Sequence, residues 1–211
     1  MDFSDLVLEF ETSRGRLLLL ADPHLGFEIT RGINIRTKFE VKLAEFISER
    51  SPDIVVILGD VKDELGLGPF TRRVLEEFFA LLGDFDVIIT KGNHDGRIEN
   101  VAEKFENIEV VNYVLIDGAL FIHGHQTLPE VEFEMAYLGH IHPAVLIGWR
   151  GVKKKVKCFF KIGNFLIIPT VNPFFEGMDV REGIKRVPFL REAVEGEAFL
   201  PPGIYLGKLS I

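Results

Sequence analysis

The first half of the chain alternates short apolar runs with longer amphipathic segments, and this alternation constrains the fold more than any other feature. Residues 16–21, 54–58 and 86–90 are rich in leucine or β-branched residues and lead into polar residues, which predicts three buried strands. Residues 37–50 and 69–83 repeat apolar side chains at helical spacing, which predicts two amphipathic helices. Successive strand–helix units require right-handed crossovers, so the sequence predicts a largely parallel sheet covered by helices.

The second half has a different pattern, in which apolar runs are short and helical spacing is rare. A short helix at residues 98–105 closes the first half. Expected strands then follow at residues 109–111, 114–116, 119–122, 135–138, 145–147, 156–160, 165–168 and 204–209. We expect mixed or antiparallel sheet here, whereas residues 173–202 give no clear pattern. Because no linker or repeat separates the halves, we expect residues 1–211 to form one domain of the α/β class.

Composition narrows the function classes without selecting one. The formal net charge of −8 argues against broad, non-specific coating of nucleic acid, although bound cations can reverse the field at one site. The single cysteine, Cys158, excludes an internal disulfide, suits a reducing compartment and is expected to be a small buried residue. The chain lacks an apolar stretch of about 18 residues and a basic N-terminal start, so we expect a cytoplasmic protein with no membrane partner.

Five polar clusters each come at the end of an apolar run, and together they contain all six histidines of the chain. They are Asp22-Pro23-His24, Gly59-Asp60, Gly92-Asn93-His94-Asp95, His123-Gly124-His125 and Gly139-His140-Ile141-His142. In open α/β sheets, ligands bind at the edge where strands end. Mixed Asp, Asn and His ligands suit Mn, Fe or Zn better than Mg or Ca, which prefer oxygen ligands alone. The clusters therefore predict a transition-metal site.

In this order, the five motifs resemble those of the calcineurin-like metallophosphoesterase superfamily, over residues 22–142. Gly139-His140-Ile141-His142-Pro143-Ala144-Val145, followed by Cys158-Phe159 and Ile168-Pro169, also resembles a narrower branch. That branch contains the ICC-like, SbcD-related archaeal phosphoesterases, which are similar to the bacterial ligase-associated enzyme PdeM. The resemblance implies a four-layer α-β-β-α sandwich with a dinuclear metal site at one edge of the central sheets.

The resemblance also implies a role for each motif residue. Two divalent transition-metal ions are expected, with Mn favoured over Fe, Zn or Ni. His94 would face the scissile phosphate and stabilise charge or protonate the leaving oxygen, and Asp95 would fix the tautomer of the His94 ring. Seven residues would bind metal: Asp22, His24 and His142 on the first ion, Asn93, His123 and His140 on the second, and Asp60 bridging both.

The function implied is hydrolysis of a phosphodiester by metal-activated water, without a covalent intermediate, and nucleic acid is the leading substrate class. A small-molecule phosphatase or a cyclic-nucleotide phosphodiesterase stays open, because it would share every metal ligand. A non-catalytic scaffold, as in the retromer coat, is disfavoured because His94 and all seven ligands are retained. The chain is shorter than a full SbcD-type nuclease, so processive nuclease action is not expected, while a homo-oligomer stays open.

Several residues near the motifs allow two interpretations. His125 lies on the same side of an extended chain as His123, and the resemblance favours His123 as the ligand, leaving His125 for an outer contact or for substrate. Arg31, Asn34 and Arg36 either reach substrate phosphate or lie on a loop surface. The basic run either protects a hairpin edge or guides a nucleic-acid backbone; it consists of Arg150, Lys153, Lys154, Lys155 and Lys157.

Two further groups are expected to serve structure more than function. The pairs Phe174-Phe175 and Phe189-Leu190 are more typical of a core or an interface than of a substrate pocket. Asp63 and Glu64 follow the bridging Asp60 closely and could support a metal ligand, but loop carboxylates are more often exposed to solvent.

Overall fold

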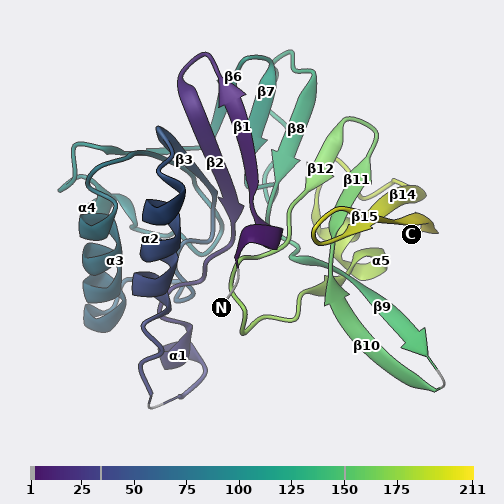
Figure 1. Cartoon of the computed structure of the whole chain (residues 1–211), viewed down its shortest axis with the longest axis horizontal. Helices are drawn as coiled ribbons and strands as arrows, with labels where there is room; N and C mark the ends of the chain where they lie inside the picture. Colours follow the sequence, from purple (N-terminus) through teal and green to yellow (C-terminus); the bar gives the residue numbers. More distant parts are fainter. Residues whose placement is uncertain (1–2, 34, 150) are drawn as a thin grey trace.

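The computed structural model describes residues 3–33, 35–149 and 151–211, so the questions about Asn34 and Arg150 lie outside the described residues. Two β-sheets stand face to face in the middle of the molecule, with helices on the outer side of the first (Figure 1). A smaller sheet and a short helix lie against the second. This confirms the α/β class, with the four layers that the resemblance implied, although the outer layer on the second sheet contains strands as well as a helix.

The first sheet has five strands in the order β1-β2-β3-β4-β5. Strands β2, β3 and β4 run parallel, as predicted. Strand β5, which was expected in the mixed sheet of the second half, extends this sheet in parallel, and β1 adds an antiparallel edge that the apolar pattern did not reveal. The strands are β1 (Leu8–Thr12), β2 (Gly15–Ala21), β3 (Ile54–Leu58), β4 (Asp86–Thr90) and β5 (Ile108–Val111).

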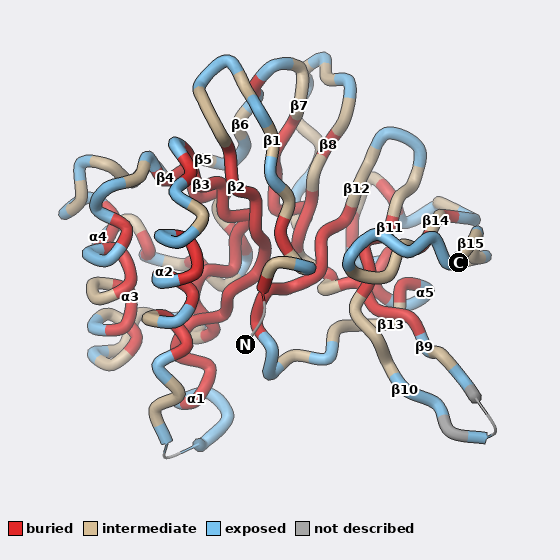
Figure 2. Tube along the Cα trace, in the orientation of Figure 1, coloured by how far each residue is buried: buried red, intermediate tan, exposed pale blue. Residues whose placement is uncertain are grey.

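The inner strands of this sheet are buried on both faces, which explains their uninterrupted apolar sequence. In β2, Leu18 and Leu20 pack toward the helices, whereas Leu17 and Leu19 pack toward the second sheet. The helices are α2 (Phe39–Arg50), α3 (Pro69–Leu81) and α4 (Glu99–Ala102), so the last is shorter than predicted. Each fully buried leucine contributes about 1.5–3 kcal/mol to the free energy of folding. Figure 2 shows that the buried parts of the chain are concentrated between the layers.

The second sheet has seven strands in the order β15-β14-β11-β12-β8-β7-β6 and is mixed, as predicted. Its β7–β8 and β8–β12 pairs are parallel, and its other pairs are antiparallel. The strands are β6 (Tyr113–Ile116), β7 (Ala119–Ile122), β8 (Met135–Leu138), β11 (Phe159–Ile162), β12 (Phe165–Ile167), β14 (Glu195–Leu200) and β15 (Ile204–Ser210).

A third sheet of β10, β9 and β13 lies beyond the seven-stranded sheet, together with the single-turn helix α5. Its strands are β9 (Pro143–Trp149), β10 (Val152–Lys157) and β13 (Met178–Asp179), and α5 spans Val180–Gly183. The prediction of a single strand at residues 156–160 was wrong, because these residues belong to two strands. At Cys158, which is buried as expected, the chain leaves β10 and enters β11 of another sheet.

Two projections leave the same side of the molecule, the β9–β10 hairpin and the arm that carries α1 (Phe27–Thr30) (Figure 1). Residues 173–202, which gave no pattern in the sequence, contain β13, α5 and β14 joined by loops. Phe189 and Leu190 pack in the core beneath α5, as expected. Among the described residues, no helix is both long enough and apolar enough to cross a membrane.

Candidate metal centre

The five polar clusters meet at one edge of the two central sheets. Asp22 and His24 follow β2, Asp60 follows β3, and Asn93 follows β4. From the other sheet, His123 follows β7, and His140 and His142 follow β8. Since β2, β3 and β4 are parallel to one another, as are β7 and β8, their carboxyl ends bring these loops together. All seven expected ligands therefore lie in one region.

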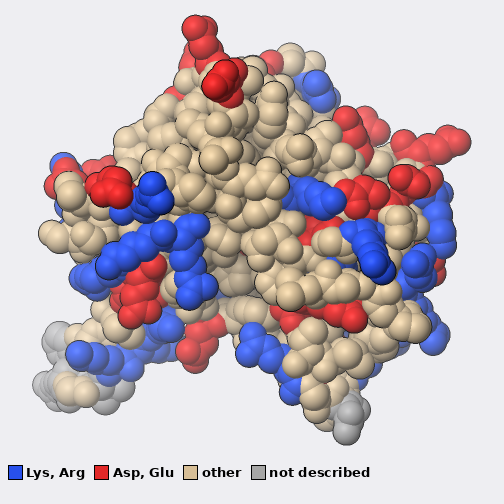
Figure 3. Space-filling model, turned by 180° about the vertical axis from the view of Figure 1, so that it is seen from behind, with Lys and Arg blue, Asp and Glu red and all other residues tan. Residues whose placement is uncertain are grey.

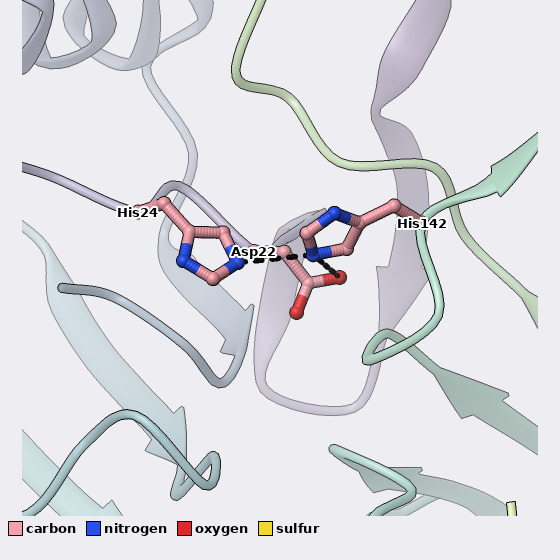
Figure 4. A group of neighbouring side chains, drawn as sticks. All are labelled: Asp22, His24 and His142. Atoms are coloured by element: carbon pink, nitrogen blue, oxygen red, sulfur yellow. Dashed lines mark hydrogen bonds and ion pairs between the residues drawn. The ribbon is translucent and has the colours of Figure 1, made fainter. Parts of the chain in front are cut away.

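The first group of donor atoms comes from Asp22, His24 and His142. Their donor atoms all lie within 4.8 Å of one another. The Nε2 atoms of His24 and His142 are 3.0 Å apart, and His142 Nε2 lies 3.7 Å from Asp22 Oδ2. Figure 4 shows the two rings and the carboxylate turned toward a common point. This is the grouping that the resemblance implied for the first metal.

The second group consists of Asp60, His123 and His140, again with donor atoms within 4.8 Å. His123 Nε2 lies 3.5 Å from Asp60 Oδ2 and 3.3 Å from the side-chain oxygen of Asn93. The same Asp60 oxygen lies 3.8 Å from His24 Nε2 in the first group. Asp60 therefore stands between the two groups, where a bridging carboxylate would be. The second group contains His123 and omits His125, whose ring centroid is 5.1 Å from that of His123.

The backbone at the site is held in a conformation that most residues avoid. Five of the seven expected ligands have positive φ, with values of 51° at Asp22, 46° at His24, 43° at Asp60, 73° at His140 and 46° at His142. Such a conformation costs a residue other than glycine about 1–3 kcal/mol. The surrounding structure must offset that cost. The strand before each loop contributes to this, because it fixes the point at which the loop begins. Strain of this kind concentrates at functional sites.

Two glycines of the motifs leave room for ligand carboxylates. A Cβ atom at Gly92 would lie 2.2 Å from Asp60 Oδ1, and one at Gly139 would lie 2.7 Å from Asp22 Oδ2. Neither position can accept a side chain while the carboxylate stays in place. The Gly-Asn and Gly-His spacings of the motifs therefore have a steric cause.

Asp95 does not contact the His94 ring, so the expectation that it fixes the His94 tautomer is not met. It is fully buried, and its carboxylate accepts hydrogen bonds from the backbone N–H groups of Gly92 and Val61, at 2.8 and 2.9 Å. Burial raises its pKa, as does the charge of Asp60. Asp95 instead ties the loop after β4 to the loop after β3. It therefore holds Asn93 and Asp60 in register.

His94 is oriented by a backbone carbonyl. Its Nδ1 lies 2.6 Å from the carbonyl oxygen of Asp63, which can only accept a hydrogen bond, so Nδ1 carries the proton. Its backbone N–H donates to Asp60 Oδ1 at 2.8 Å. The ring lines the cavity in front of the metal groups. Nε2 is then the ring atom left to exchange a proton with a bound molecule.

Asp63 lies in a different environment from the exposed loop expected for it. It is buried, and its Oδ1 lies 3.0 Å from His24 Nδ1, while Thr30 donates a hydrogen bond to its other oxygen. A carboxylate in this position orients a metal-binding imidazole and makes it a stronger ligand. Its neighbour Glu64 serves structure, since it accepts hydrogen bonds from Gly68 N and Thr71 Oγ1 at the start of α3. Only spacing from Asp60 hinted at the role of Asp63.

Lys62 is a further buried residue that sequence analysis missed. It is fully buried, and burial lowers its pKa. Its ammonium donates hydrogen bonds to the backbone carbonyls of Glu64, Leu65 and His94. Lys62 therefore joins the loop that carries Asp63 to the loop that carries His94. No feature of the sequence separates it from an ordinary surface lysine.

The electrostatics of the site favour bound cations. Burial raises the pKa of Asp22 well above its usual range, and the nearby Asp60 charge adds to this, although His123 opposes it. Burial opposes charge on His123, but the Asp60 and Asp22 carboxylates raise its pKa to about 9. Burial lowers the pKa of His140 to about 4 and that of His142 well below 6.5. His140 and His142 therefore favour their neutral, metal-binding form, whereas Asp22 and His123 hold protons that a bound cation would displace.

The donor set fits a pair of transition-metal ions. Among the residues that the structure describes, no lysine or arginine forms an ion pair with Asp22 or Asp60. Buried carboxylates without such partners are costly unless another cation compensates them. The mixture of imidazole nitrogen and carboxylate oxygen suits Mn, Fe or Zn. The residues that would hold these ions are the seven predicted from the sequence.

A cavity of about 510 Å³ opens in front of the two groups. Its rim carries Phe174 and Phe175, so the expectation that this pair belongs to a core or an interface was wrong. Phe175 stacks on the His24 ring, with centroids 4.9 Å apart and planes 15° from parallel. Arg31 and Arg186 also line the cavity, and Arg186 was not foreseen. Figure 3 shows lysine and arginine side chains on both projections and a hollow between them.

The remaining basic residues divide between structure and surface. Arg36 donates to Glu40 at 2.6 Å and to Glu77 at 2.5 Å, which ties α2 to α3 away from the cavity. Lys157 is half-buried and donates to the carbonyl oxygens of Thr170 and Asn172, at 2.8 and 2.6 Å. Lys153 and Lys154 remain exposed on the hairpin, where either interpretation of the basic run stays open.

Residues 170–172 connect the rim to the metal loops, and sequence analysis missed them. Thr170 Oγ1 donates to the carbonyl oxygen of Asp22 at 2.6 Å, and Asn172 Nδ2 donates to that of Pro23 at 2.8 Å. Both side chains are fully buried. The Asn172-Pro173 pair, which is typical of turns, was the available signal.

Comparison with known proteins agrees with this geometry. The family model of the calcineurin-like phosphoesterases matches residues 15–160. Among solved structures, the nuclease MPE of Pseudomonas putida is similar with a TM-score of 0.64 and 20% identity, covering 95% of this chain and 100% of that one. The phosphoesterase YfcE of E. coli is similar with a TM-score of 0.45 and 15% identity, over 92% and 98% of the two chains. No curated protein sequence matches the chain.

The family match covers most of the chain and includes the strands and loops that supply the seven expected metal ligands. It does not separate the narrower SbcD-related branch from the rest of the family. The chain belongs to the calcineurin-like phosphoesterase family and is a metal-dependent hydrolase of phosphoesters.

Proposed function

We propose that the protein hydrolyses phosphodiesters, with nucleic acid as its substrate class. The observation that carries the proposal is the arrangement of Asp60 between two groups of ligands, with His94 beside them on the cavity wall. When bound, a pair of divalent cations supplies Lewis acidity toward phosphoryl oxygens and lowers the pKa of water. Manganese is the cation we favour, because the donor set mixes nitrogen and oxygen.

The residues of this chain would position and protonate the substrate. His94, in its doubly protonated form, would present the Nε2 proton to the leaving oxygen and donate it, while Nδ1 keeps its own proton on the carbonyl oxygen of Asp63. Arg31 and Arg186 on the rim would attract the phosphodiester and any flanking phosphate. The Asp63 carboxylate and the Phe175 ring would hold His24 in place from two sides.

Two observations favour a diester over a monoester. Among the described residues that line the cavity, His94 is the imidazole outside the expected ligand set, and Arg31 and Arg186 lie on the same cavity, where they would hold the phosphates that flank a diester. The overall likeness to a nuclease supports the same choice. We further propose that residues 1–211 act as a single domain, which the apolar interface shared by the central sheets supports. The free thiol of Cys158 supports a cytoplasmic location, and the motif at residues 139–145 supports the SbcD-related branch.

The test compares bis-p-nitrophenyl phosphate with p-nitrophenyl phosphate, using metal-stripped protein to which Mn²⁺ is added. We expect Mn²⁺-dependent turnover of the diester, and a decrease in kcat of about 10²–10⁴-fold in His94→Ala with the metal content retained. Single- and double-stranded DNA are tested in parallel. Turnover of the monoester alone would replace the proposal with a small-molecule phosphatase. If protein with two bound metals turns over none of these substrates, the proposed hydrolysis is refuted.

A further inference from the structure

Phe174 occupies an unusual position for a large aromatic residue. Its side chain is 49% exposed and lines the cavity in front of the metal centre. Beneath it, the Phe27 ring is stacked, with centroids 4.7 Å apart and planes 28° from parallel. Leaving an aromatic surface of this kind in water sacrifices the free energy of its burial. The ring is therefore available to a bound molecule.

The loop that carries Phe174 is fixed with respect to the metal ligands. The backbone N–H of Phe174 donates to Asn172 Oδ1 at 3.0 Å. The amide of the same buried side chain donates to the carbonyl oxygen of Pro23, between the ligands Asp22 and His24. Phe174 is thus tied to the backbone of the metal loop through one asparagine. A ring held in this way can set the distance between a stacked group and the reacting phosphate.

Two arginines and one glutamate line the same cavity as Phe174. The guanidinium carbon of Arg31 lies 4.9 Å from the centroid of the neighbouring Phe175 ring, and Arg186 lines the same cavity. Glu176 also lies on this rim and is the acidic group that a phosphate must avoid. Aromatic rings interleaved with arginines bind single-stranded nucleic acid, because the rings stack on bases while the cations neutralise the backbone.

We propose that Phe174 is a stacking subsite for the nucleobase next to the scissile phosphodiester. The preferred substrate is then a nucleoside phosphodiester with an unpaired base, as in single-stranded nucleic acid or at a frayed end. A base inside a duplex is already stacked on its neighbours and would have to leave them first. The inference rests on the proposed function, whose substrate class it narrows.

The first test uses two diesters with the same leaving group, thymidine 5′-(p-nitrophenyl phosphate) and methyl p-nitrophenyl phosphate. We expect the Mn²⁺-loaded enzyme to prefer the thymidine ester in kcat/KM. Phe174→Leu, which keeps an apolar side chain but removes the aromatic face, should reduce that preference on the order of 5- to 100-fold. Phe174→Trp should restore it. An unchanged preference in Phe174→Leu would overturn the subsite.

A matched control is Tyr205→Leu, which also removes a half-exposed aromatic ring, at 54% exposure, from β15 outside the cavity. It should leave the preference as in the wild type. If it lowers the preference as much as Phe174→Leu does, the effect is not specific to the rim and the subsite is refuted.

Binding separates failure of the subsite from failure of the proposed reaction. Anisotropy of a fluorescent oligothymidine is measured on Mn²⁺-loaded His94→Ala protein, with and without Phe174→Leu, beside an abasic oligomer and a duplex. We expect Phe174→Leu to weaken oligothymidine binding and to leave abasic binding unchanged. That result without hydrolysis of any diester would support the subsite while refuting the reaction. Equal binding of oligothymidine by both proteins would refute the subsite even if hydrolysis occurs.

Discussion

The floor and the rim of the cavity are built in opposite ways. The floor consists of carboxylates and imidazoles on strained loops, each at the end of a strand. Gly92 and Gly139 lie so close to the Asp60 and Asp22 carboxylates that these have little room to move. The rim consists of Phe174, Phe175 and the acidic Glu176 on one loop, with Arg31 on the α1 arm and Arg186 beyond α5. The ligand loops of the floor lie within the residues that match the family, whereas residues 174–177 of the rim lie beyond them. Under the proposed function, the floor would bind the metals and the rim would select the phosphoester.

The largest effect that distinguishes floor from rim should come from pH. Carboxylates raise the pKa of His123 to about 9, so below that pH a cation must displace a proton from the ring before it binds. Metal affinity should therefore rise about tenfold per pH unit as pH increases toward about 9 and then level off. Titration in metal buffers between pH 6 and 9.5 measures this. Affinity independent of pH would show that His123 is not a ligand.

Asp63→Ala should weaken metal binding by about 10–100-fold, because His24 loses the carboxylate that lies 3.0 Å from its Nδ1. The adjacent Glu64→Ala is the matched control. It removes the hydrogen bonds at the start of α3 and should cost about 1 kcal/mol of stability without changing metal affinity. Competition with a chelator and thermal unfolding report the two quantities. Equal metal affinity in both variants would show that Asp63 does not support His24 as a metal ligand.

Lys157→Met should loosen the connection between floor and rim, because its ammonium holds the carbonyl oxygens of Thr170 and Asn172. The buried Thr170 carbonyl would lose this donor, whereas the Asn172 carbonyl would keep the backbone N–H of Phe175 at 3.3 Å. The loss should cost about 1–3 kcal/mol of stability. Lys154→Met, on an exposed position of the same hairpin, should stay within about 0.5 kcal/mol. Urea unfolding of both variants makes the comparison. Equal stabilities would show that the loop is held without Lys157.

The same contrast explains what could be predicted from the sequence. Strands buried on both faces produce uninterrupted apolar runs, and their ends locate the ligand loops. The parallel sheet and the metal clusters could therefore be predicted from the sequence. The residues that hold the ligand loops from outside could not be predicted. Lys62, Asp63 and Asn172 act by reaching carbonyls and a ring that are distant along the chain, and no local pattern encodes such contacts.

The errors have equally physical causes. The apolar run at residues 156–160 reads as one strand, but two sheets compete for it and the chain crosses between them at Cys158. Phe174-Phe175 reads as core because composition cannot show that a loop carries the pair to the rim of a polar cavity. The resemblance assigned Asp95 to the His94 ring, whereas its carboxylate accepts hydrogen bonds from the backbone N–H groups of Gly92 and Val61.

The most direct test of the central claim is the electron paramagnetic resonance spectrum of Mn²⁺-loaded protein, together with its metal content. The account predicts two Mn²⁺ ions per chain with a spin-coupled spectrum, because one Asp60 oxygen lies between the two ligand groups. Asp60→Asn should lose the coupling. Wild-type protein that binds a single ion, or two ions with uncoupled spectra, would contradict the dinuclear centre on which the proposed hydrolysis depends.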